Sequence, residues 1–170
     1  MTGHEHEVAG IISRYWRVDG VRPFVPMFDA RFRKAGIVLS EKRRWIPGYV
    51  FLESELNGLD FYLQIKPHIL RTENVLKMLR YGSGNMDSSF EIQEVERAFL
   101  QKLLSNEQYI EMSQGYIKGS TIIVNDGPLV GLEGLITKVN RHKMEATIKI
   151  SLFGSVREVK VGLELVRKIP

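Results

Sequence analysis

The chain has 170 residues, 44% of them hydrophobic, and a formal net charge of +4 at pH 7, which fits one or two small globular domains. It has no cysteine, which excludes disulfides, cysteine-ligated zinc and cysteine nucleophiles and fits a reducing cytoplasm. No run of about 18 apolar residues is present, so we expect no membrane span. The first seven residues also lack the pattern of a secretory signal.

The excess positive charge lies in the last third of the chain. Residues 1–112 hold 15 Lys and Arg against 15 Asp and Glu, whereas residues 113–170 hold 9 against 5. A basic module of this size is a candidate for binding phosphates. A solvated basic surface without a partner would give the same pattern, and charge alone does not separate the two interpretations.

The predicted elements of the first 105 residues mix helices and strands. An amphipathic helix over 5–16 is followed by an extended segment over 21–27, a basic hairpin over 29–45 and a buried strand over 49–52. A short helix over 59–65, a further strand over 74–80 and a second amphipathic helix over 92–105 complete this part. Helical spacing of apolar residues indicates the amphipathic helices, and two prolines keep 21–27 extended. Ala35-Gly36 marks the hairpin turn, and Ser88 with Glu91 fits a capping box. Polar residues at 106–115 then indicate a linker.

A second domain is predicted over 116–170 from short strands at regular spacing. The expected strands are 121–124, 135–139, 145–152, 157–161 and 165–167. Five short antiparallel strands in about 50 residues are typical of a closed SH3-like barrel. The segment from Val124 to Ile136, VNDGPLVGLEGLI, resembles a KOW motif, found in RNA- and protein-binding barrels of transcription and ribosomal proteins.

Two separate segments resemble the NusG family of transcription factors, in the order that the family has them. The C-terminal half is similar to its KOW domain, with Ser151 to Ser155 at the place of a Phe-Gly loop. Trp45 to Glu53, WIPGYVFLE, resembles the FPGYV-type strand of the family's NGN domain. The resemblance implies an α+β chain: an NGN-like antiparallel sheet with flanking helices over 1–105, a linker over 106–115, and a small all-β SH3-like KOW barrel over 116–170.

Within the family the chain is similar to specialised paralogs of the LoaP type. The features that favour this are the basic KOW half, the turn Asn140-Arg141-His142-Lys143, and residues 74–79, where the housekeeping type is richer in glycine. The family also opens with a Trp-Tyr-containing strand just before a segment like Thr2 to Glu5, at which this chain begins. We expect from this that the sequence is truncated at its start or that the N-terminal domain is impaired, because a missing central strand exposes backbone groups.

The resemblance implies that the NGN-like domain docks on the clamp helices of RNA polymerase. The candidate contacts are apolar or aromatic residues: Ile46, Tyr49, Phe61, Tyr62 and Met78. An exposed cluster of this kind fits an interface, whereas each residue could equally fill the core. Phe51 is assigned to the core.

The hairpin carries a second candidate site, rich in cations. These are Arg31, Arg33, Lys34, Lys42, Arg43 and Arg44, with Phe32 and Trp45 between them. Arginines next to aromatic rings suit phosphate contact and base stacking, and in the family this region lies near upstream DNA. A solvated hairpin face with a core aromatic is the alternative.

The KOW-like half carries the candidate RNA site. Its residues are expected on turns and outward strand positions: Lys138, Arg141, His142, Lys143 and Arg157. Arginine binds phosphates bidentately, and an RNA hairpin is recognised largely by its shape and loops. Generic barrel surface is the alternative. By resemblance, Phe153 contacts ribosomal protein S10 or Rho, and a core aromatic is an equal alternative.

The sequence holds no catalytic signature. It lacks the HExxH, P-loop, GxGxxG and GxSxG patterns, and its four histidines lack the spacing of metal ligands. We therefore expect no enzyme, cofactor or metal, but a monomeric processive antiterminator that binds polymerase through the NGN-like domain and a leader RNA hairpin through the KOW domain. The alternatives are a housekeeping elongation factor whose KOW domain binds proteins, and a ribosome-associated KOW protein.

Overall fold

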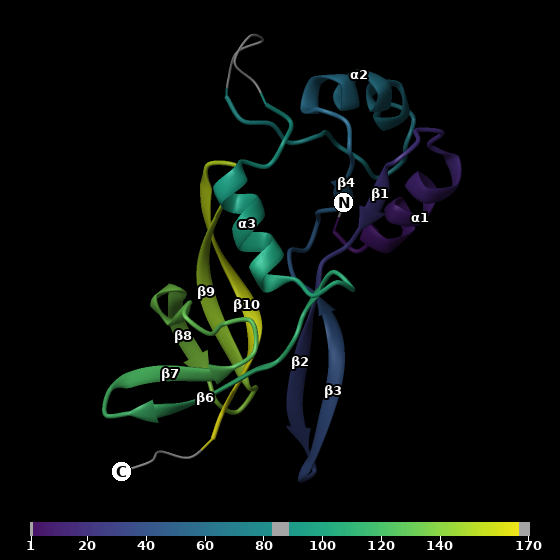
Figure 1. Ribbon diagram of the computed structural model, residues 1–170. Coiled ribbons are helices and arrows are strands. Elements are labelled where there is room, and N and C mark those ends of the chain that lie inside the picture. Colours follow the sequence, from purple (N-terminus) through teal and green to yellow (C-terminus); the bar gives the residue numbers. More distant parts are fainter. Residues whose placement is uncertain (1, 83–88, 167–170) are drawn as a thin grey trace. The chain divides into compact units, whose positions relative to one another are not determined.

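The computed structural model describes residues 2–82 and 89–166 (Figure 1). The described part is α+β, as the sequence predicted, with three α-helices and several small sheets. The chain divides into two compact units, one built from Met1–Val25 and Ile46–Arg97 and the other from Pro26–Trp45 and Ala98–Pro170. None of the helices in the described ranges is long and apolar enough to cross a membrane.

The first unit packs two helices around a small core. Its elements are α1 (Glu5–Tyr15), β1 (Arg22–Phe24), β4 (Phe51–Glu53) and α2 (Gly58–Ile69). β1 pairs antiparallel with β4, and Phe51 is buried as predicted. Four-residue spacing puts Val8 and Ile12 on one face of α1, where they join a buried cluster with Trp16, Phe61 and Ile65. A further helix, α3, spans Glu94–Leu103.

The second unit contains the predicted hairpin as part of a three-stranded sheet. Its strands are β2 (Met27–Lys34), β3 (Ile37–Arg44) and β5 (Tyr109–Ile110), in the order β3-β2-β5. β2 pairs antiparallel with β3 and parallel with β5. The two turn residues, Ala35 and Gly36, have φ values of 51° and 80°, which a two-residue type I′ hairpin turn requires.

The rest of the second unit is a curled five-stranded half-barrel. Its strands are β6 (Ser113–Lys118), β7 (Thr121–Asp126), β8 (Ile136–Asn140), β9 (Glu145–Leu152) and β10 (Ser155–Leu165), with a short 3-10 helix at Glu133–Leu135. The order is β7-β6-β10-β9-β8. Along β9, Ala146, Ile148, Ile150 and Leu152 are buried, and this period of two sets the core face. The arrangement is consistent with a KOW-type, SH3-like barrel.

Several local predictions differ from the structure. The strand expected over 74–80 is absent, because Val75 and Met78 pack against the helical core of the first unit instead of entering a sheet. The strand expected at 157–161 is part of a longer β10, Ser155–Leu165. The strand expected at 165–167 is not separate: its first residue ends β10, Val166 follows outside it, and residue 167 lies outside the described residues. β5 and β6, which the sequence did not predict, begin within 106–115. The capping residue Ser88 lies outside the described residues.

Candidate nucleic-acid and protein interfaces

The hairpin has a basic face and an apolar face. Directly opposed residues of an antiparallel pair point to the same side, and successive residues of a strand alternate. The register of β2 with β3 therefore puts four cations on one side of the hairpin: Arg31, Arg33, Lys42 and Arg44.

The other side of the hairpin is apolar near its tip. Phe32 lies opposite Leu39, and Ile37 and Leu39 are 63% and 40% exposed. Arg43 also points to this side, with its guanidinium 5.9 Å from the centre of the Phe32 ring. Lys34, opposite Ile37, is on this side too. Four of the six hairpin cations therefore share one face, and the other two lie among apolar side chains, where phosphate contact and stacking are combined.

Two hairpin arginines are paired with carboxylates of the half-barrel. Arg31 lies 3.4 Å from Glu164, and Arg43 lies 3.0 Å from Glu145. Sequence reasoning missed both pairs, since the partners are 133 and 102 residues apart.

The outward face of the half-barrel carries a row of lysines. Lys138 of β8 and Lys160 of β10 both lie in register with Thr147 of β9, so they share one side of the sheet. Lys160 was not among the predicted site residues, although its alternation with Val159 and Val161 along β10 marks it as outward-facing.

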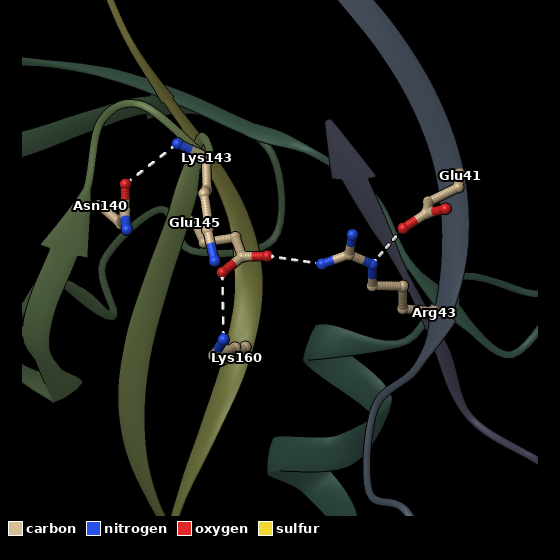
Figure 2. Close-up of polar contacts among 6 residues, drawn as sticks. All are labelled: Glu41, Arg43, Asn140, Lys143, Glu145 and Lys160. Atoms are coloured by element: carbon tan, nitrogen blue, oxygen red, sulfur yellow. Dashed lines mark hydrogen bonds and ion pairs between the residues drawn. The ribbon is translucent and has the colours of Figure 1, made fainter. Parts of the chain in front are cut away.

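The predicted RNA-binding turn lies at one end of β9. Arg141, His142 and Lys143 are exposed there. The side-chain oxygen of Asn140 accepts a hydrogen bond of 3.0 Å from the backbone N–H of Lys143 (Figure 2), and this Asx-type contact fixes the turn. The structure thereby groups these three residues with Lys138 of the adjoining strand.

Arg157 does not join that group. It lies in register with Ile150, five residues along β9 from the turn end, or roughly 17 Å. Because Ile150 is buried, Arg157 shares the inward face rather than the outward face expected from sequence, and it is half-buried. The outward row and the turn therefore form the accessible basic surface.

Phe153 lies in the turn at the other end of β9. It and Gly154 have φ values of 52° and 68°, and Leu152 pairs with Ser155, so the two residues form a tight type I′ turn. The Phe153 side chain is half-buried. This turn is well separated along β9 from the basic turn.

The five polymerase-contact candidates differ in exposure. Ile46 and Phe61 are 4% and 6% exposed and belong to the interior. Tyr49, Tyr62 and Met78 are half-buried, so part of each side chain reaches solvent. The Tyr62 ring stacks on Phe90 with centroids 3.9 Å apart, which fixes its orientation.

A buried carboxylate, which sequence reasoning missed, anchors the loop that carries Ile46 and Tyr49. Glu5, at the start of α1, is 2% exposed. Its carboxylate accepts hydrogen bonds from the backbone N–H groups of Gly3, at 2.9 Å, and Gly48, at 2.6 Å. An acidic residue in the first turn of a helix was the only signal in the sequence.

Glu133 also accepts a hydrogen bond from a distant backbone N–H, that of Val124 in the KOW-like segment, at 3.2 Å. Hydrogen bonds from its own backbone N–H and from those of Val124 and Gly131, together with the charge of Lys102, lower the pKa of Glu133, against an opposing effect of burial. A carboxyl group whose pKa is lower in the folded state stabilises the fold above its unfolded pKa of about 4.3. That stabilisation is lost as the pH falls through the folded pKa.

We predict that Glu133→Gln destabilises the barrel at pH 7 by about 0.5–1.5 kcal/mol, the range for one hydrogen bond. The difference from wild type should shrink when urea unfolding is repeated at an acidic pH below the lowered pKa of folded Glu133. The matched control is Glu158→Gln, on exposed surface of β10, which should unfold like wild type at both pH values. A difference that persists in acid would contradict the role of the Glu133 charge.

No site for a metal ion is evident in the described ranges. Within 2–82 and 89–166, no group of three or more His, Asp or Glu residues could hold one.

The whole chain is similar to bacterial NusG proteins. No family model matches it. The transcription termination/antitermination protein NusG of Vibrio vulnificus is 22% identical over 174 residues, which cover 99% of this chain and 91% of that protein. The protein of that name from Haemophilus influenzae is 25% identical over 99% of this chain and 90% of its own length. The one from Escherichia coli is 23% identical over 85% and 76%. These similarities support the NusG resemblance across both halves of the chain.

Proposed function

We propose that this protein is a NusG-type transcription factor that acts by binding: it holds RNA polymerase through its NGN-like part and an RNA hairpin through its KOW-like barrel. The observation that carries the general role is the similarity to NusG proteins over 99% of the chain. A role in transcription elongation or termination follows from the names of those relatives. The specialised role, processive antitermination of the LoaP type, rests on the basic surface of the barrel.

Polymerase binding is assigned to the first unit. Tyr49, Tyr62 and Met78 offer half-buried apolar surface, whereas Ile46 and Phe61 are buried in the interior. Aromatic and methionine side chains of this kind are enriched at protein interfaces. The expected partner is the clamp helices of the polymerase.

RNA binding is assigned to the turn formed by Arg141, His142 and Lys143, with Lys138 beside it. Exposed cations on a rigid turn can follow the phosphates of a hairpin, which is recognised by its shape. Arg157, on the inward face near the other end of β9, is left out of this proposed RNA surface. Two weak modules on one elongation complex raise each other's effective concentration, so neither needs high affinity alone.

A salt titration tests the RNA surface. We predict that Lys143→Ala lowers the slope of log affinity against log salt by about 0.7–0.9, the loss of one phosphate contact. Lys118→Ala, which removes an exposed lysine from the β6–β7 end of the same barrel, should leave the slope unchanged. The measurement is fluorescence anisotropy with a leader hairpin identified in the host. A flat slope for the wild-type protein would exclude recruitment by RNA.

Crosslinking and sequencing of RNA bound in the host tests the specialised role. Enrichment of one or a few leader hairpins would support an RNA-recruited antiterminator. A diffuse signal over all transcripts would favour the housekeeping role, in which Phe153 on its tight turn contacts ribosomal protein S10 or Rho. Copurification with ribosomal subunits but not with polymerase would favour a ribosome-associated protein instead.

A further inference from the structure

The half-barrel holds a buried carboxylate between two cations from different strands. Figure 2 shows the Glu145 carboxylate between the guanidinium of Arg43, from the hairpin, and the ammonium of Lys160, from β10. The distances are 3.0 and 3.3 Å, and Glu145 is only 4% exposed. Arg43 also contacts Glu41 on its own strand. A carboxylate this deeply buried is strongly destabilising if a partner is withdrawn, so Glu145 favours the state in which Arg43 is docked.

A second acidic residue of β10 holds the same hairpin. Glu164 pairs with Arg31 at 3.4 Å, and both side chains are about one-third exposed, at 34%. Glu145 is in register with Gly162, and Glu164 lies two residues further along β10, so all three face the same side. We call Glu145, Gly162 and Glu164 the acidic cradle.

Gly162 lets the hairpin backbone rest on the barrel. A Cβ atom at this position would lie 2.4 Å from the backbone oxygen of Asp29 in β2, which is closer than real Cβ atoms come. Its φ is not in the left-handed region, so the backbone of β10 does not itself require glycine. The missing side chain therefore serves the approach of the hairpin.

The cradle neutralises two hairpin arginines that the sequence predicts to contact nucleic acid. Arg43 is paired with Glu145 and Glu41, and Arg31 with Glu164. Carboxylates and phosphates present paired oxygens to arginine in the same way. The ion pair between an arginine and a carboxylate must therefore break before that arginine can bind a phosphate with full affinity.

We propose that the acidic cradle is a docking surface for the chain's own hairpin, and that the phosphates of duplex DNA displace it. The carboxylates of the barrel and the phosphates of DNA then compete for the same hairpin arginines. This inference rests on the contact between the hairpin and DNA that the sequence predicts from its arginines and interleaved aromatic rings. In the free protein, the apparent affinity for DNA is lowered according to the fraction of molecules in which the hairpin occupies the cradle.

The test uses the full chain and a fluorescein-labelled duplex of about 20 base pairs, two helical turns. Gly162→Ala pushes the hairpin off the barrel, and Glu164→Gln removes one carboxylate. Both variants should bind the duplex tighter than wild type, by roughly fivefold for Gly162→Ala and twofold for Glu164→Gln. Gly134→Ala, where an added Cβ meets open space, and Glu158→Gln, with the same change in charge, are the matched controls and should bind like wild type.

A second readout follows the cradle directly. In ¹⁵N NMR spectra, Gly162→Ala should shift the amides of 160–163, and adding duplex to the wild-type protein should shift the same amides. If Gly162→Ala fails to fold, Glu164→Gln alone carries the test, because its side chain is partly exposed and its loss disturbs little packing.

The outcomes separate this inference from the predicted contact between the hairpin and DNA, and neither depends on the proposed binding of RNA and polymerase. If Arg33→Ala weakens DNA binding while both cradle variants bind like wild type, the hairpin contacts DNA and the cradle does not cover it. If the wild-type protein and all variants fail to bind the duplex, the proposed DNA contact fails, and the competition fails with it. Tighter binding by the cradle variants but not by the controls, with matching amide shifts, supports the competition.

Discussion

Replacing Gly127 by alanine is expected to unfold the C-terminal half-barrel. Gly127 has a φ of 90°, which an alanine adopts only with strain of about 1–3 kcal/mol. A Cβ atom there would also lie 2.6 Å from the Cα of Ser113 and 2.9 Å from the carbonyl oxygen of Met112. These are backbone atoms and cannot turn away as a side chain would. Overpacking adds about 1–3 kcal/mol more.

The surroundings of Gly127 leave no room for adjustment. Ser113 is fully buried, and its hydroxyl oxygen accepts a hydrogen bond of 3.1 Å from the backbone N–H of Leu129, also fully buried. Moving β6 to make space would break this bond and open the core. Together the costs reach about 2–6 kcal/mol, a large part of the stability of a small domain.

Gly119→Ala separates strain from clash. Gly119 has a φ of 61°, but an added Cβ would meet nothing within 4 Å. The free energy of unfolding of Gly119→Ala should therefore fall only by the cost of backbone strain, and the barrel of this variant should remain folded. The measurement is urea unfolding of both variants, followed by far-UV circular dichroism and by the NMR signals of β9. Equal losses in the two variants would show that contact with Ser113 has no effect.

Removing the Glu5 side chain is expected to destabilise the first unit by about 2–3 kcal/mol. The carboxylate accepts bonds from Gly3 and Gly48, and hydrogen bonds to a charged group contribute about 1.5–3 kcal/mol each to stability before relaxation. Glu5→Ala should therefore release the loop at 46–49 from the start of α1. Because Ile46 and Tyr49 lie on that loop, polymerase binding should weaken as well.

Glu7→Ala is the matched control on the same helix. Its carboxylate is exposed and contacts His4 three residues earlier, at 2.8 Å, a surface pair that contributes little. Thermal unfolding and copurification with polymerase would be measured for both variants. Loss of stability in Glu5→Ala with unchanged polymerase binding would mean that the position of this loop does not matter for docking.

Elements determined by local pattern were predicted well. The helix starting at Glu5, the turn at Ala35-Gly36 and the span of β9 follow from the spacing of apolar residues and from turn chemistry. Residues 74–80 show the limit of that reasoning. Their leucine and lysine content gives little β preference, and burial of Val75 and Met78 against two helices determined the outcome.

The candidate sites depended more on contacts that are distant in sequence. Periodicity located the basic turn, but Arg157 was expected on the outward side of its strand, although its spacing of two from the buried Val159 puts it on the inward side. Periodicity could not foresee that Arg43 would pair with a carboxylate 102 residues away. Such pairings follow from how strands are arranged, which no local pattern records.

The length of β9 has a consequence for how many partners the barrel can take at once. The basic turn and the Phe153 turn are at its two ends, separated by the eight residues Glu145–Leu152, or roughly 24 Å. An RNA strand held at one end would leave the other open to a protein. The barrel could therefore bridge a transcript to a second factor, so that recruitment by RNA and coupling to a protein are simultaneous rather than competing states.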